Sequence, residues 1–301
     1  MKAIVMRQYG TVDALALADV GEPRPGPREI KVRVAVAGIN PVDWKLRSGA
    51  LRGRMPLELP TILGRDVAGQ IVEVGSEVTA FEKGDRVMGL VEHGYAEYVV
   101  ADVDAWAKVP DELSFITAGV LPLVGLTGRE LAEEAVDVKP GQLVLVTGAV
   151  GAVGRVAVYA AKKRGARVIA GVRASQRAAA AKLEVESVVA LDDASEVSRL
   201  PELDAIADTI DGEVLERLFA KLKPGGTVGS VVGDSVHARA LGFDVHTLLT
   251  HPDPERLEEL GHAALAGAFT LPIERTFPLA EASRAQQLAE GRGVGKVLLT
   301  V

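Results

Sequence analysis

About the first 115 residues alternate between apolar and polar positions over short runs that end at glycine, proline or aspartate. Alternation over about four to eight residues predicts half-buried β-strands. Regularly spaced short strands of this kind favour a small barrel-like β unit. The runs that carry the pattern cover residues 30–39, 67–75, 84–91 and 96–102.

The pattern changes near residue 115, where continuous apolar runs begin to alternate with alanine-rich helical stretches. Continuous apolar strands that alternate with helices predict a parallel sheet covered on both faces. A helix entered through proline and aspartate follows at residues 251–269, and a β-rich tail follows at residues 271–301. The expected strands of the parallel sheet cover residues 142–148, 166–172, 205–210 and 226–233, with a helix at 154–165 after the first of them.

Composition narrows the class of protein. The chain has 301 residues, of which 48% are hydrophobic and 25% charged, which is typical of a folded globular protein and excludes a disordered one. It contains no cysteine, which excludes disulfides, thiolate nucleophiles and cysteine-bound zinc. A net charge of −7 without a basic block argues against nucleic acid as a partner.

Nothing in the sequence predicts a membrane partner. No apolar run approaches the roughly 18 residues that a membrane span needs. Residues 1–10 also lack the pattern of a secretory signal, because no small-residue cleavage site follows their short apolar stretch. We therefore expect a cytoplasmic protein.

The most informative stretch is a glycine-rich loop between the first apolar strand and its helix. Three glycines at intervals of three predict a tight turn, close backbone approach to a pyrophosphate and a helix N-terminus facing that anion. A glycine triplet alone also fits an ordinary turn. Here the flanking strand and helix and the following second strand favour dinucleotide binding. The predicted contacts are Gly148, Val150, Gly151, Ala152, Val153 and Gly154.

The residues after the second strand bear on the choice of cofactor. NAD-binding proteins place an acidic residue there for the ribose 2′-hydroxyl, whereas this chain has no acid in residues 170–177. Arg173 and Arg177 are suited to pair with a 2′-phosphate, and Ser175 to donate a hydrogen bond to it. The pattern favours NADPH, and the alternative is a solvated basic loop.

One competing motif is accidental. Tyr159 and Lys163 match the Y-x-x-x-K pair of short-chain dehydrogenases, and the loop resembles theirs except that Ala152 stands where glycine is needed. The pair lies on the helix directly after the glycine loop, too early for catalysis. We expect Tyr159 to be a packing residue and Lys163 to lie at a solvated helix end.

Several ordered motifs together resemble the medium-chain dehydrogenase/reductases, and within them the zinc-free quinone oxidoreductase branch. NPVDWKLRSG at residues 40–49 is similar to the subgroup of alkenal and enone reductases. The resemblance extends through LPTILGRDVAGQIVEVG, FEKGDRVMGL, GYAEYVV, LPLVGLTG, VKPGQLVLVTGAVGAVG, LKPGGTVGSVVG and FPLAEASRAQQLAEGRGVGKVLLTV. It covers nearly the whole chain.

The resemblance implies an α/β architecture with a GroES-like β-barrel domain and a doubly wound Rossmann domain that meet at a cleft. We expect the GroES-like domain at residues 1–116, the Rossmann domain at 117–268 and a return to the first domain at 269–301. It also implies a homodimer formed through Rossmann edge strands. The zinc ligands of other branches are missing, because residues 40–41 and 64–66 read Asn-Pro and Gly-Arg-Asp. We therefore expect no metal.

The resemblance further implies hydride transfer from NADPH to a quinone or an α,β-unsaturated carbonyl compound. Asn40, the only asparagine, lies in the motif that faces the nicotinamide in relatives, although Asn-Pro also starts ordinary turns. Trp44 and Tyr95 are candidate walls of the substrate pocket. We expect Asp43 and Arg47 to pair, and Asp66 and Lys296 to be structural. Further expected cofactor contacts are Thr127, Thr209, Val232 and Gly233.

Two other functions fit the same fold, because one fold hosts many functions. The first is a sensor that binds NADPH without catalysis. The second is an enoyl-thioester reductase that acts on a carrier-bound chain.

Overall fold

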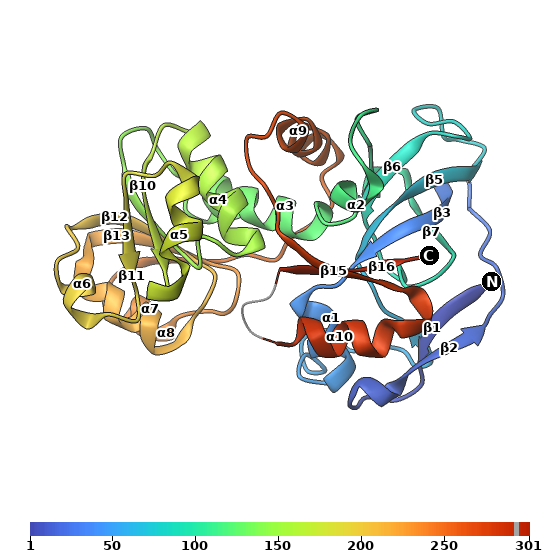
Figure 1. Cartoon of the computed structure of the whole chain (residues 1–301), viewed down its shortest axis with the longest axis horizontal. Coiled ribbons are helices and arrows are strands. Elements are labelled where there is room, and N and C mark those ends of the chain that lie inside the picture. The colour runs from blue at the N-terminus through green and yellow to red at the C-terminus, as the bar shows by residue number, and fades with distance from the viewer. Residues whose placement is uncertain (292–294) are drawn as a thin grey trace. The chain divides into compact units, whose positions relative to one another are not determined.

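The computed structural model describes residues 1–291 and 295–301, and most of its elements are labelled in Figure 1. The chain divides into two compact units. Unit 1 comprises residues 1–123, 251–267 and 271–301, and unit 2 comprises residues 124–250 and 268–270. The sequence predicts a GroES-like domain at residues 1–116, a Rossmann domain at 117–268 and a return to the first domain at 269–301. Among the described helices, none has the length and apolar character needed to cross a membrane.

Unit 1 contains most of the antiparallel pairing. Its larger sheet has the order β15-β16-β3-β5-β6-β8, with β7 also paired to β3, and its smaller sheet has the order β2-β1-β4. The strands are β1 (Lys2–Met6), β2 (Leu15–Asp19), β3 (Glu29–Gly38), β4 (Thr61–Ile62), β5 (Asp66–Val74), β6 (Arg86–Leu90), β7 (Tyr98–Asp102), β8 (Trp106–Lys108), β15 (Ile273–Pro278) and β16 (Lys296–Thr300).

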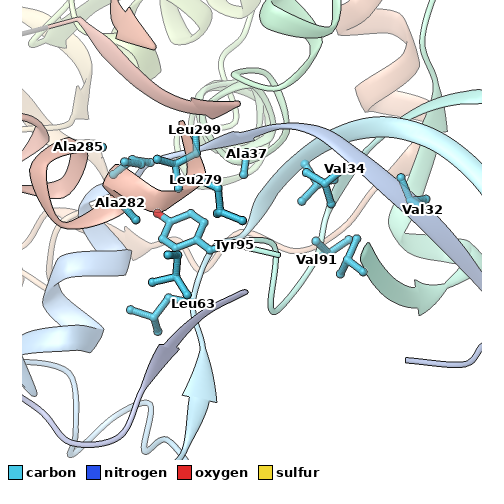
Figure 2. Packing of buried hydrophobic residues seen from close by; sticks show 14 of the residues in the cluster. Val32, Val34, Ala37, Leu63, Val91, Tyr95, Leu279, Ala282, Ala285 and Leu299 are labelled. Atoms are coloured by element: carbon cyan, nitrogen blue, oxygen red, sulfur yellow. The ribbon is translucent and has the colours of Figure 1, made fainter. Parts of the chain in front are cut away.

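The core of unit 1 forms where the inward side chains of these strands meet. Val32 and Val34 of β3 are buried on this face, as the alternating pattern predicts. Figure 2 shows the ring of Tyr95 among Leu63, Leu279 and Ala282, so segments from both ends of the chain share one core. The helices of this unit are α1 (Pro41–Ser48), α2 (Phe115–Ala118), α9 (Pro254–Leu265) and α10 (Ala282–Ala289).

Unit 2 is built on a parallel sheet with the order β11-β10-β9-β12-β13-β14. Counted along the chain, this is the order 3-2-1-4-5-6 of the doubly wound fold. The order reverses between β9 and β12, and ligands of such sheets bind at the carboxyl ends of the strands at this point. The strands are β9 (Leu143–Thr147), β10 (Arg167–Val172), β11 (Ser187–Ala190), β12 (Leu203–Asp208), β13 (Leu222–Ser230) and β14 (Asp244–Thr247).

Helices cover both faces of this sheet, which explains the continuous apolar strands. Val144 and Val146 of β9 pack into one apolar cluster, whereas Leu143 and Leu145 pack into the cluster on the opposite face. The α/β fold predicted from the sequence is therefore confirmed. The helices associated with the sheet are α3 (Pro122–Glu130, which spans the boundary between the units), α4 (Ala152–Lys163), α5 (Arg177–Ala180), α6 (Ala194–Ser198), α7 (Gly212–Leu218) and α8 (Val236–Ala240).

Two features of the last fifty residues differ from the expectation. Helix α9 belongs to unit 1, where Gly261 packs closely against Met88. The tail predicted as β-rich contains helix α10 between β15 and β16. Residues 292–294 of the C-terminal motif lie outside the described residues.

Candidate functional site

The glycine loop connects β9 to α4 at the point where the sheet order reverses. Gly148 has φ +59°, a left-handed conformation that glycine adopts without strain. The Gly151 N–H donates to the Gly148 carbonyl oxygen over 2.8 Å and closes the turn. A Cβ on Gly154 would lie 2.2 Å from that same oxygen, so only glycine lets the helix pack this close to the loop. Gly148 and Gly154 thus each have a structural reason to be glycine.

Helix α4 begins directly after this turn, with Gly151 as its N-cap. The first N–H groups of an α-helix have no partners within the helix, and they carry the positive end of the helix dipole. Arg155 follows in the next turn and donates from Nε to the Val150 carbonyl oxygen over 2.9 Å. Partial burial lowers the pKa of Arg155 from its ordinary value. The loop, the helix terminus and the Arg155 cation together suit a pyrophosphate.

A buried carboxylate connects the ends of three strands of the parallel sheet by hydrogen bonds. Asp208, at the end of β12, accepts hydrogen bonds from Thr147 Oγ1 over 2.8 Å and from Ser230 Oγ over 3.2 Å. The backbone N–H groups of Ile210 and Asp211 also donate to it. Burial raises the pKa of Asp208 despite these hydrogen bonds. The ends of β9, β12 and β13 are therefore tied to one side chain, which the sequence analysis missed.

The other predicted cofactor contacts of unit 2 lie near this edge. Thr209 donates to the Thr147 carbonyl oxygen over 2.8 Å, and a Cβ on Gly148 would lie 2.4 Å from its hydroxyl oxygen. Val232 and Gly233 follow the end of β13 and are partly exposed.

Thr127 reaches unit 2 on helix α3. Its hydroxyl shares a hydrogen bond of 2.6 Å with that of Thr250. The next residue, Gly128, packs so closely on α4 that a Cβ would lie 2.6 Å from the Val153 carbonyl oxygen. Thr127 is thereby held beside the helix that follows the glycine loop.

The residues after β10 that were predicted to bind a phosphate differ in whether their charge is already paired. Arg173 and Ser175 are exposed, as an anion site requires. Arg177 instead forms an ion pair with Glu196, and that carboxylate also accepts the Ala190 N–H. The structure therefore separates Arg177 from Arg173 in function, since a role for Arg177 toward a phosphate requires this ion pair to break.

In unit 1 the predicted substrate residue Asn40 lies in a buried polar cluster. Its Nδ2 donates to Asp66 Oδ2 over 2.7 Å, and its Oδ1 accepts from Lys296 Nζ over 2.6 Å. Lys296 also donates to the Ile39 carbonyl oxygen and lies 3.4 Å from Asp66 Oδ2. The other oxygen of Asp66 accepts the Leu123 N–H at the start of α3. Asn40, Asp66 and Lys296 are all buried.

A second part of the cluster surrounds Asp43. Asp43 Oδ2 accepts the Asn40 N–H over 2.8 Å and the Tyr95 hydroxyl over 2.7 Å, while Oδ1 is buried without a hydrogen-bond partner. Burial is the main cause that raises the pKa of Asp43 from 3.8 to about 7. Burial likewise raises the pKa of Tyr95 well above its usual range.

The expected pair of Asp43 and Arg47 does not form. Arg47 Nη1 donates to Gln286 of α10 over 2.5 Å, and Arg47 Nη2 pairs with Glu290. These partners follow Arg47 by 239 and 243 residues, so sequence spacing gave no signal for them. Tyr95 and Asn40 are fully covered, and only Trp44 of the three predicted substrate residues keeps exposed surface.

Fold and loop together define a dehydrogenase architecture with a nucleotide-binding unit. Residues 26–111 match the family model described as alcohol dehydrogenase GroES-like domain. Residues 183–299 match the model described as zinc-binding dehydrogenase. Dehydrogenases of this superfamily bind a nicotinamide cofactor.

Individual relatives identify the branch of dehydrogenases to which the chain is similar. The probable quinone oxidoreductase of Schizosaccharomyces pombe is 31% identical over 300 residues, which cover 92% of this chain and 90% of that protein. The solved quinone oxidoreductase from Coxiella burnetii superimposes with a TM-score of 0.89 at 30% identity, covering 100% of this chain and 99% of that one. The chain belongs to the quinone oxidoreductases of the medium-chain dehydrogenase/reductase superfamily, which confirms the family predicted from the sequence.

Other curated relatives match over a shorter stretch. The chloroplastic quinone-oxidoreductase homolog of Spinacia oleracea is 36% identical over 172 residues, which cover 54% of this chain and 52% of that protein. The chain thus spans about half the length of the first curated relatives that it matches.

The zinc named in the second family model does not fit this cluster. Within residues 1–291 and 295–301, no three His, Cys, Asp or Glu side chains group as metal ligands. The Lys296 ammonium lies between Asn40 Oδ1 and Asp66 Oδ2, the positions that the resemblance relates to zinc ligands. A metal cation beside this ammonium would be repelled.

Proposed function

We propose that the protein is a zinc-independent oxidoreductase that transfers hydride from NADPH to a quinone or an α,β-unsaturated carbonyl compound. The observation that carries the proposal is the glycine loop, which stands before α4 at the point where the strand order reverses. Membership of the quinone oxidoreductase family supports the acceptor class.

Three groups of residues would contact different parts of the cofactor. The loop from Gly148 to Gly154 and the N-terminus of α4 would hold the pyrophosphate. Arg173 and Ser175 would hold the 2′-phosphate. The nicotinamide supplies a hydride when it is bound. The remaining cofactor surface is assigned to Thr127, Thr209, Val232 and Gly233.

The acceptor classes need little from the protein beyond orientation and a hydrogen-bond donor. A quinone or enone carries a conjugated oxygen that takes the developing negative charge, and water protonates the resulting anion. Asn40, Trp44 and Tyr95 stay predictions as substrate contacts. Because Asn40 and Tyr95 are engaged inside unit 1, Trp44 is the member with surface left for a ligand.

We also propose that the protein forms a homodimer through β14. Among the described strands of unit 2, β14 lies at one edge of the sheet with β13 as its neighbour. Edge strands offer unpaired backbone groups to another chain. Exposed apolar residues flank this edge, namely Val236, Leu241 and Leu249.

The experiment that tests the activity is oxidation of NADPH and of NADH, followed by absorbance, with a simple quinone and with a short enone. We expect turnover with both acceptor types and a higher kcat/KM for NADPH. Tight binding without turnover would support a sensor, and turnover confined to acyl thioesters would support an enoyl-thioester reductase.

The loop assignment predicts that Gly151→Asp abolishes cofactor binding. Aspartate is a good N-cap, so α4 should still form, but its carboxylate would repel the pyrophosphate. Gly151→Ser is the matched control, since serine also caps helices and adds a Cβ without charge. Cofactor fluorescence titration should show loss of binding for Gly151→Asp and a much smaller effect for Gly151→Ser. Equal effects in the two variants would contradict the assignment.

A further inference from the structure

An acidic side chain lies against the loop that the sequence assigned to the 2′-phosphate. Asp192 follows β11 and accepts the Ala174 N–H on Oδ1 over 2.8 Å. Ala174 stands between Arg173 and Ser175, two residues after the end of β10. The ribose 2′ group of a bound dinucleotide lies at the carboxyl end of this second strand. A carboxylate therefore borders the ribose site, although β10 itself supplies none.

The charges around this loop do not favour a phosphate strongly. Arg173 has no side-chain hydrogen bond or ion pair to the residues the structure describes, so its charge is available. Arg177 is neutralised by Glu196. Asp193 adds another negative charge, but its Oδ1 accepts the Ser195 and Glu196 N–H groups as the N-cap of α6. The loop after β10 thus carries one available cation, Arg173, and its backbone is bound by the carboxylate of Asp192.

We infer that Asp192 is a specificity-determining residue that opposes Arg173 at the ribose site, so that the protein accepts NADH as well as NADPH. Its Oδ2 is without a hydrogen-bond partner in residues 1–291 and 295–301, and accepts the 2′-hydroxyl of NADH. The same charge repels a 2′-phosphate. The inference rests on the proposed function, because it concerns the same cofactor site.

The test compares cofactor affinities of Asp192→Asn and the unchanged protein by fluorescence titration, without any acceptor. We expect the Kd for NADPH to fall about tenfold, because a like charge beside the phosphate is removed. The Kd for NADH should rise about threefold, because an amide oxygen is a weaker acceptor than a carboxylate. The NADPH gain should shrink at high salt, since both groups are exposed.

Asp193→Asn is the matched control. It removes the same charge one residue further on, and asparagine keeps the N-cap of α6. We expect its ratio of NADPH to NADH affinity to change less than threefold. A ratio that changes equally in both variants would reduce the effect to net charge and overturn the assignment to Asp192.

An unchanged affinity ratio in Asp192→Asn would also overturn the inference. Failure of the proposed function gives a different result, because then the unchanged protein would either bind neither cofactor or bind a cofactor without reducing any acceptor.

Discussion

Arg173 and Arg177 have the same charge and similar exposure, yet the structure gives them different environments. Arg177 is paired with Glu196, whereas no described residue engages the guanidinium of Arg173. The sequence could not separate them, because Glu196 belongs to α6 and follows Arg177 by 19 residues. The ion pair with Glu196 therefore decides which of the two arginines is available to an anion.

We predict that Arg173→Ala weakens NADPH binding at least tenfold and leaves NADH binding within about twofold, because a charge-assisted hydrogen bond to phosphate is lost. Titration of both cofactors gives the two affinities. Arg177→Ala is the control and should change the affinity for NADPH less. Equal losses for NADPH and NADH in Arg173→Ala would refute the 2′-phosphate role.

Two acidic residues at the ends of neighbouring strands, Asp192 and Asp208, were not predicted. The sequence has no acid directly after β10, whereas Asp192 follows β11 and Asp208 is the last residue of β12. Parallel strands bring their carboxyl ends to one edge, so residues far apart in sequence meet there. A polar residue that ends an apolar strand was the available signal, and Asp208 at the end of β12 is such a residue.

At the scale of elements, the glycine loop was predictable because its causes are local. Strand β9, the three glycines and helix α4 occupy one continuous stretch of sequence. Helix α10 was not predicted although its apolar and polar residues are segregated at helical spacing, because the expectation for residues 271–301 was a β-rich tail. Ala282, Ala285 and Gln286 are its buried residues. Gln286 is polar and accepts a hydrogen bond from Arg47.

The proposed dimer contact at β14 can be tested by one substitution beside this strand. Leu249→Glu should shift the protein from dimer to monomer, because Leu249 is 77% exposed beside the edge strand and a charge there would be desolvated on association. Analytical ultracentrifugation measures the state. Leu17→Glu is the control, since Leu17 is 44% exposed in unit 1. A dimer that withstands Leu249→Glu argues for another interface.

At the scale of the whole molecule, a buried carboxyl makes stability depend on pH. The pKa of Asp43 is raised from 3.8 to about 7 in the folded state. Between these values the folded protein holds a proton that the unfolded chain releases. The free energy of unfolding therefore falls as pH rises through this window, and this contribution is fully present only below about pH 4.

We predict that Asp43→Asn removes this component. The difference in unfolding free energy, variant minus unchanged protein, should rise between pH 4 and 7 by up to about 1.4 kcal/mol per pH unit. Urea denaturation at several pH values measures it. The exposed Asp13→Asn serves as the comparison for removing a carboxyl group outside the core. A flat difference for Asp43→Asn would show that the buried carboxyl stays charged.

The interrupted sequence of unit 1 has a consequence for protein synthesis. Strand β16 pairs with β3 from Val36 to Gly38, yet about 260 residues separate the two strands. On the ribosome, residues 124–250 of unit 2 emerge before β16 exists. At about 5–20 residues per second, translation leaves that edge of β3 without this partner for roughly 13–50 s. The nascent chain thus carries an open strand edge, which is the kind of surface that chaperones bind and that aggregation exploits.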